Sequence, residues 1–143
     1  SFFAYGEDVD WCLRAQLNGF KFIYQPKALV HHKGQATGDR NKKLLNYLCF
    51  RNWIICMGKN FPFSIFLKKY RFIVIPAILI HSFFNLLING YGKEALTALA
   101  WILINLQKLL QQRKSVLQHR RVSINYLNSW MANKKFRFLN KTN

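Results

Sequence analysis

Acidic residues are rare in this chain, and they cluster near its start. Of the five Asp and Glu residues, three lie within four positions, as Glu7, Asp8 and Asp10. Residues i and i+3 share a face of a helix and residues i and i+1 do not, so these carboxylates would point in different directions from a helix. One of them could face a cleft while another caps the helix or pairs locally, and Asp10 can pair with Arg14 four residues later. The alternative is that acidic residues only favour the positive end of a helix dipole.

Two adjacent histidines, His31 and His32, are the second candidate group. They follow a predicted extended segment and precede residues 33–38, which contain two glycines and are predicted to form a loop. Neutral imidazole is a common metal ligand, so a histidine in this place could contact a metal or another ligand. A histidine pair alone is more often structural, and the hypothesis depends on the acidic cluster that precedes it.

Several motifs follow one another in a characteristic order. They are an aromatic pair, a Glu-Asp-x-Asp cluster, Leu-Arg, Gly-aromatic, Pro and Val-x-His, which here are Phe2-Phe3, Glu7–Asp10, Leu13-Arg14, Gly19-Phe20, Pro26 and Val30–His32. This order over residues 2–38 resembles the end of the catalytic domain of family-2 glycosyltransferases. The closest group is the bacterial rhamnosyltransferase-like enzymes that build cell-surface polysaccharides. A looser likeness continues through Tyr47, Arg51 and Asn52.

The resemblance implies an inverting transfer of a sugar from a nucleotide-sugar donor to a glycan acceptor. Asp8 matches the family's catalytic base, which takes the proton of the acceptor hydroxyl as that oxygen attacks the anomeric carbon. Glu7 and Asp10 would hold the acceptor or the start of the helix. These roles make the acidic cluster the expected acceptor side of the site.

The resemblance also implies residues on the donor side. His32 matches the family's histidine that contacts a divalent cation, Mg²⁺ or Mn²⁺, and this cation offsets charge on the leaving nucleoside diphosphate. Lys33 and Arg51 could help to hold phosphate, and the guanidinium of Arg51 could do so in bidentate geometry.

The family's nucleotide-binding half, with its Asp-x-Asp metal motif, lies upstream of the part that residues 2–38 resemble. This sequence has no such motif outside Asp8-Val9-Asp10, which matches the region of the base instead. We therefore expect a missing N-terminal part that carries the other cation ligands, and we expect the chain by itself to be inactive.

The predicted fold class is α+β and mostly helical, as the C-terminal end of a GT-A domain (a Rossmann-like α/β fold) followed by membrane-associated helices. Helical periodicity and capping residues predict helices over 7–18, from Asp39 to about Met57, over 93–121, and a short one over 123–130. Gly19 and Gly58 are expected to end the first two helices. Short strands are predicted over Phe20–Tyr24 and, as a possible second piece, Lys27–Val30.

Charge divides the chain unevenly. Residues 1–38 carry four basic and three acidic residues, whereas residues 39–143 carry 18 basic and two acidic residues. We predict a catalytic part over 1–58, a hydrophobic and basic helical extension over 59–132, and a basic flexible tail over 133–143. The uncharged run at 72–88 is at the lower limit for a membrane crossing and the run at 95–107 is too short, so helices that lie in or dip into one leaflet fit better than two crossings. The alternatives are a spanning helix and a buried pair of helices in a soluble fold.

The formal net charge of +17, with 51% hydrophobic residues, favours a partner that is both anionic and apolar. Basic flanks stay cytoplasmic, so the expected location is the cytoplasmic face of the bacterial inner membrane, peripheral or re-entrant, with a lipid-linked acceptor. The second hypothesis is a non-catalytic basic membrane-binding remnant. The third, a nucleic-acid binder, is the weakest because no standard motif occurs, and we expect no specific nucleic acid. Three cysteines are too few for a disulfide scaffold.

Overall fold

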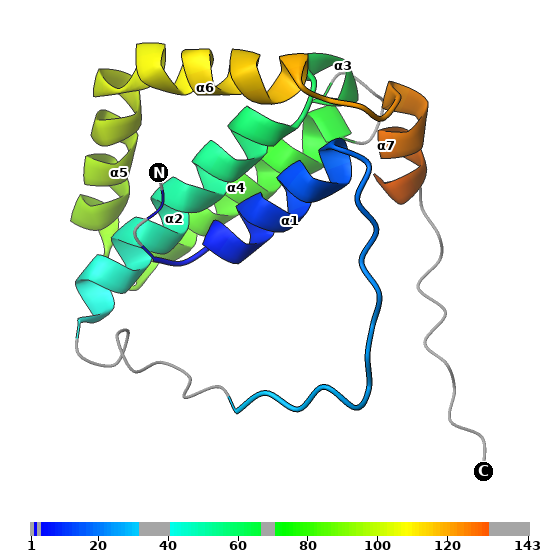
Figure 1. Cartoon of the computed structure of the whole chain (residues 1–143). Helices are drawn as coiled ribbons and strands as arrows, with labels where there is room; N and C mark the ends of the chain where they lie inside the picture. The colour runs from blue at the N-terminus through cyan, green and yellow to red at the C-terminus, as the bar shows by residue number, and fades with distance from the viewer. Residues whose placement is uncertain (1, 3, 32–40, 67–70, 132–143) are drawn as a thin grey trace.

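The chain folds as a group of helices around one central helix. The structure is a computed structural model that describes residue 2 and residues 4–31, 41–66 and 71–131. Helix α2 contacts α1, α4, α5 and α6, and Figure 1 shows α1 and α4 running along it while α5 and α6 meet at a corner. In chain order, the helices of these residues are α1 (Glu7–Leu17), α2 (Lys42–Asn60), α3 (Phe63–Phe66), α4 (Arg71–Ile88), α5 (Gly92–Ile104), α6 (Leu106–Gln118) and α7 (Ile124–Met131).

The first predicted helix is confirmed, and it ends as its sequence indicates. Gly19 adopts φ 86°, in the left-handed region that favours glycine. Its backbone N–H donates to the carbonyl of Gln16 at 2.9 Å, and the N–H of Phe20 donates to the carbonyl of Ala15 at 3.0 Å. This pair of bonds is a Schellman motif, which satisfies the last carbonyls of α1.

The mostly helical part of the α+β prediction is confirmed, but its strands are wrong. The segments Phe20–Tyr24 and Lys27–Val30 contain no strand, and the residues that the structure describes form helices and connecting segments alone. Both segments are exposed; Ile23 is 91% exposed and Leu29 is 87% exposed. A strand is stabilised by ladder hydrogen bonds to a neighbouring strand, and the described part of the chain contains no strand that could pair with these segments.

The start of α2 differs from its prediction. Asp39, expected as the cap, lies outside the described residues. Asn41 is the N-cap instead, and its side-chain oxygen accepts a hydrogen bond from the backbone N–H of Leu44 at 3.0 Å. Asparagine is among the best N-cap residues because it satisfies one of the free N–H groups of the first turn.

The end of α2 also lies further along the chain than predicted. The helix continues through Gly58 to Asn60, so the expectation that Gly58 closes it is wrong. Phe61, the residue that precedes Pro62, is extended, with φ −99° and ψ 129°. The proline ring disfavours the helical region for the residue before it, and this restriction rather than the glycine ends the helix.

The long helix predicted over 93–121 is two helices. It breaks at Asn105, which has φ −97° and ψ 11° and whose side-chain amide donates to the carbonyl of Trp101 at 2.9 Å. The break lets α5 and α6 follow different directions while both contact α2 (Figure 1). Further on, the predicted cap of α7 is confirmed, because the hydroxyl of Ser123 accepts from the N–H of Tyr126 at 3.1 Å.

Among the described residues, two apolar clusters form the core, and both include helix α2 or its end. The first joins α1, the residue after α2, and α7, through the buried side chains of Leu17, Phe61 and Leu127. The second joins α2 to α5, through the buried side chains of Phe50, Ala95 and Ala98. Each cluster combines side chains from residues 1–58 with side chains from residues 59–132. The predicted boundary between these two parts falls inside α2.

None of the helices in the described ranges has both the length and the hydropathy that a membrane crossing requires. Residues 133–143, the predicted tail, lie outside these ranges.

Candidate functional site

The acidic cluster begins at a backbone turn that α2 holds in place. Tyr5 and Gly6 are both in the left-handed region, with φ 66° and φ 84°. The side-chain amide of Asn52 donates to the carbonyls of Ala4 and Tyr5, at 2.7 Å each. Asn52 is buried, and its two bonds satisfy carbonyls of an irregular segment that has no helix of its own. The start of α1, and hence the position of Asp8, is therefore set by α2.

Arg51 supports this turn from the interior. Its guanidinium donates two hydrogen bonds to the side-chain oxygen of Asn52, at 3.0 and 2.9 Å, and a third to the hydroxyl of Tyr47 at 3.1 Å. It also lies 4.6 Å from the ring centroid of Trp101. In this arrangement the buried guanidinium fixes Asn52 and joins α2 to α5. The contact of Arg51 with phosphate stays a prediction.

Asp10 is the anchored member of the acidic cluster. It is 2% exposed, and its carboxylate forms ion pairs with Arg14 at 2.9 Å and with Lys59 at 2.8 Å. The side-chain amide of Asn60 donates to the same carboxylate at 2.7 Å. The pairing of Asp10 with Arg14, predicted from their spacing, is confirmed. Lys59 and Asn60 belong to the last turn of α2, so this network ties α1 to the end of α2.

The environment of Asp10 changes its acidity. Burial by itself raises the pKa of this carboxyl, because it disfavours the charged form. Lys59, Asn60 and Arg14 favour the carboxylate and outweigh burial, so the pKa of Asp10 lies below its ordinary value of 3.8. Asp10 is therefore a charged structural group.

Glu7 and Asp8 are exposed, in contrast to Asp10. A carboxylate oxygen of Asp8 accepts from the backbone N–H of Val9 at 2.8 Å, and neither Asp8 nor Glu7 has an ion pair among the described residues. Trp11, three residues after Asp8 and so on the same face of α1, is 58% exposed. Its ring and the ring of Phe22 pack edge to face, with 5.9 Å between centroids. This face offers free carboxylates next to an apolar ring, which suits a ligand with hydroxyl groups and an apolar side.

Within the described residues, the structure places none of the predicted donor-side residues next to the face of α1 that carries Asp8 and Trp11. His32 and Lys33 lie outside the described residues, and His31 is exposed. No three His, Cys, Asp or Glu side chains come together in the described ranges. Since His32, the implied ligand, falls outside these ranges, the described residues do not amount to a site for Mg²⁺ or Mn²⁺.

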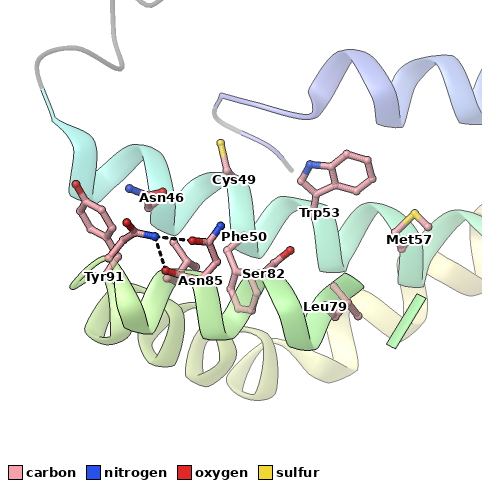
Figure 2. Close-up of a pocket in the computed structure, with 11 residues that line it drawn as sticks. Asn46, Cys49, Phe50, Trp53, Met57, Leu79, Ser82, Asn85 and Tyr91 are labelled. Atoms are coloured by element: carbon pink, nitrogen blue, oxygen red, sulfur yellow. Dashed lines mark hydrogen bonds between the residues drawn. The ribbon is translucent and has the colours of Figure 1, made fainter. Parts of the chain in front are cut away.

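A groove between α2 and α4 was missed by the sequence analysis (Figure 2). Its volume is about 540 Å³, and its walls are mostly apolar. A sequence signal for it exists: Ser82, Asn85 and Asn89 recur at helical spacing within or just after an uncharged stretch, and polar residues at that spacing share one face of a helix. All three line the groove.

Comparison with known proteins adds no relative. Neither a family model, a curated protein nor a solved structure matches this chain.

Proposed function

We propose that this chain is the acceptor-side part of an inverting glycosyltransferase in which Asp8 is the general base. One observation carries the proposal: the three clustered carboxylates have separate environments. Asp10 is buried in ion pairs, whereas Glu7 and Asp8 of the same helix are exposed. If the three carboxylates served only to favour the helix dipole, one of them would not need to be buried while the other two are exposed.

The proposed reaction is a single displacement. The acceptor hydroxyl oxygen attacks the anomeric carbon of the donor, Asp8 takes the proton of that hydroxyl, and the nucleoside diphosphate leaves from the opposite side. General base catalysis of this kind contributes typically about 10²–10⁴-fold to the rate. Glu7 accepts hydrogen bonds from acceptor hydroxyls, and the exposed ring of Trp11 provides an apolar surface beside them.

The donor side of the proposal rests on the resemblance alone. His32 would contact the divalent cation, and Lys33 would contact phosphate. The base role of Asp8 does not depend on that cation.

The exposed segment after α1 supports a larger catalytic domain. Several apolar side chains of residues 20–30 are 84–91% exposed, namely Ile23, Tyr24, Leu29 and Val30. A group of apolar side chains that is this exposed is typical of a surface that packs against another part of a protein. We propose that this segment packs against the donor-binding half.

The test of the base is the variant Asp8→Asn in a chain that also carries the donor-binding half. Asparagine keeps the size of the side chain but cannot take the proton, so turnover should fall about 10²–10⁴-fold. Asp8→Glu should retain part of the activity. Since Asp8 is exposed, both variants should unfold at the urea concentration of the parent. Unchanged turnover in Asp8→Asn would refute the assignment.

A second candidate, a membrane-surface module, is favoured by exposed apolar side chains on the later helices. Ile80, Phe84 and Ile88 follow one another at four-residue spacing on α4 and are 55–84% exposed. Leu103 and Ile104, at the end of α5, are 69% and 83% exposed. Apolar patches of this kind on a basic chain suit an anionic leaflet. The chain could have this membrane-surface function together with the proposed transferase function, or it could bind membranes without it.

A further inference from the structure

The groove between α2 and α4 changes in polarity along its length. Figure 2 shows Trp53, Met57 and Leu79 toward one end and Asn46, Asn85 and Tyr91 toward the other. At the polar end, the side-chain amide of Asn89 donates to the backbone and side-chain oxygens of Asn85. A groove that is apolar at one end and amide-lined at the other fits a ligand with the same division.

Positively charged side chains lie near the amide-lined end of the groove. A second hollow of about 360 Å³ lies between the first turn of α2 and the first turn of α5. Two of its residues lie close in sequence to residues at the polar end of the groove: Tyr47 is next to Asn46, and Lys93 comes two residues after Tyr91. The charged side chains that line it are Lys43, Lys93 and Glu94, which leaves one net positive charge.

The first turn of α2 adds to this positive region. It contains Lys42 and Lys43 and has no acidic residue. The positive end of the helix dipole ordinarily favours acidic side chains in a first turn, and lysines there are unfavourable unless an anion is near. An anionic group at this end of the groove would relieve that repulsion, and lysine is a common phosphate ligand.

We infer that the groove binds a single-chain lipid phosphate. The hydrocarbon chain lies between α2 and α4 against Trp53, Met57 and Leu79, and the phosphate lies at the amide end toward Lys43 and Lys93. The volume is within the range of about 300–1,000 Å³ typical of small-ligand sites. This inference goes beyond the function proposed above and does not require Asp8 to be a base.

The test uses the fluorescence of Trp53 in the full chain. Among the described residues that line the groove, Trp53 is the only tryptophan. Brominated dodecyl phosphate, kept below the concentration at which it forms micelles, should quench part of the tryptophan emission in a saturable way. Trp53→Phe should remove that part. Inorganic phosphate should neither quench nor compete, and unbrominated dodecanol should compete at least about ten-fold more weakly, because it lacks the charge.

Matched variants locate the site. Ser82→Phe places a ring inside the groove and should weaken binding by at least about ten-fold, whereas Ser115→Phe, on the exposed side of α6, should leave it unchanged. If Ser82→Phe does not keep the helical circular dichroism of the parent, Leu79→Gln serves the same purpose at the apolar end. The double variant Lys43→Gln/Lys93→Gln should weaken dodecyl phosphate by about ten-fold and leave dodecanol unaffected.

Three results would overturn the inference. One is equal binding by a folded Ser82→Phe or Leu79→Gln variant and by the parent. Another is equal affinity for butyl and dodecyl phosphate, because the groove would then contribute nothing. The third is self-association that shields Trp53 from the quencher before any lipid is added, since the groove would then be an interface between copies of the chain.

Discussion

Residues of one chemical type have different roles here because their neighbours differ. Asp8 and Asp10 are two positions apart on α1, yet only Asp10 meets the last turn of α2. Asn60 donates to Asp10 and to the carbonyl of Cys56, at 2.7 and 3.0 Å, and so closes this turn. The same network acts on the thiol of Cys56: burial, with the nearby charge of Asp10, raises its pKa to about 11.

Replacing the anchored carboxylate should destabilise the fold. In Asp10→Asn, Lys59 keeps its charge while its side chain is only 11% exposed. Because a buried charge without its partner is costly, the free energy of unfolding should fall by about 3 kcal/mol. Urea unfolding at pH 7 measures this difference. Glu7→Gln, which removes an exposed carboxylate of the same helix, is the control and should change stability by less than about 1 kcal/mol.

The difference in the free energy of unfolding between the parent and Asp10→Asn should depend on pH, which provides an independent check. The pKa of Asp10 is lower in the folded chain than its ordinary value of 3.8, so the folded state favours the ionised form. The stabilisation is therefore complete well above pH 3.8 and disappears as the pH falls through the folded pKa. The gap between the parent and Asp10→Asn should close in acid. A gap that stays constant down to pH 2.5 would contradict the assigned ion pairs.

At the scale of elements, the ends of the helices are determined by local chemistry. After α4, Gly90 has φ 79°, its N–H donates to Leu87 at 3.1 Å, and the N–H of Tyr91 donates to Leu86 at 2.7 Å. This Schellman motif repeats the end of α1. Gly58 is different, because it lies inside α2 with helical neighbours on both sides. A glycine ends a helix only where the chain after it can turn away.

The two glycines should respond in opposite directions to the same substitution. A β-carbon at either position would meet no atom within 4 Å, so the two sites differ mainly in backbone conformation. Gly58→Ala should raise the free energy of unfolding by about 0.5–1 kcal/mol, since alanine costs less entropy in a helix. Gly90→Ala should lower it by about 1–2 kcal/mol, since φ 79° is strained for alanine. Urea denaturation of both variants tests the sign, and equal effects would argue against the assigned helix ends.

At the scale of the whole molecule, distant parts of the sequence share one core. Leu127 of α7 is fully buried beside Leu17 of α1, and the N–H of Arg121 donates to the carbonyl of Leu17 at 2.9 Å. Arg113 of α6 donates to the carbonyls of Gly58 and Phe61 at the end of α2. The later helices therefore complete the packing of the earlier ones. Membrane binding is best tested on the full chain for this reason.

The full chain should bind anionic vesicles more tightly than neutral ones. Each basic side chain near an anionic surface contributes about 1 kcal/mol, and salt screens this attraction over about 10 Å at 0.1 M. Flotation with phosphatidylglycerol vesicles at low salt should retain the chain, and high salt should release part of it. Ile80→Ser/Phe84→Ser should weaken binding, whereas Leu29→Ser/Val30→Ser, an equally apolar pair outside the helices, should not. A chain that stays with the unbound fraction at low salt would exclude the membrane-surface function.

Much of the local structure was determined by the sequence itself. The extent of α1, its end at Gly19, the cap of α7 at Ser123 and the pairing of Asp10 with Arg14 all depend on residues within six positions of one another. Interactions at this range depend on residue type and helix geometry, which a pattern contains. The predicted strands failed because a strand requires a partner, and partners are not a local property.

Tertiary structure decided which carboxylate is available and where a ligand could fit. The burial of Asp10 depends on Lys59 and Asn60, about 50 positions away in the sequence, and the burial of Arg51 on Trp101. The groove exists only because α4 packs along α2 at a distance that leaves space between their polar and apolar side chains. Desolvation and cavity shape arise from the approach of several helices at once, so no single segment of the sequence contains them.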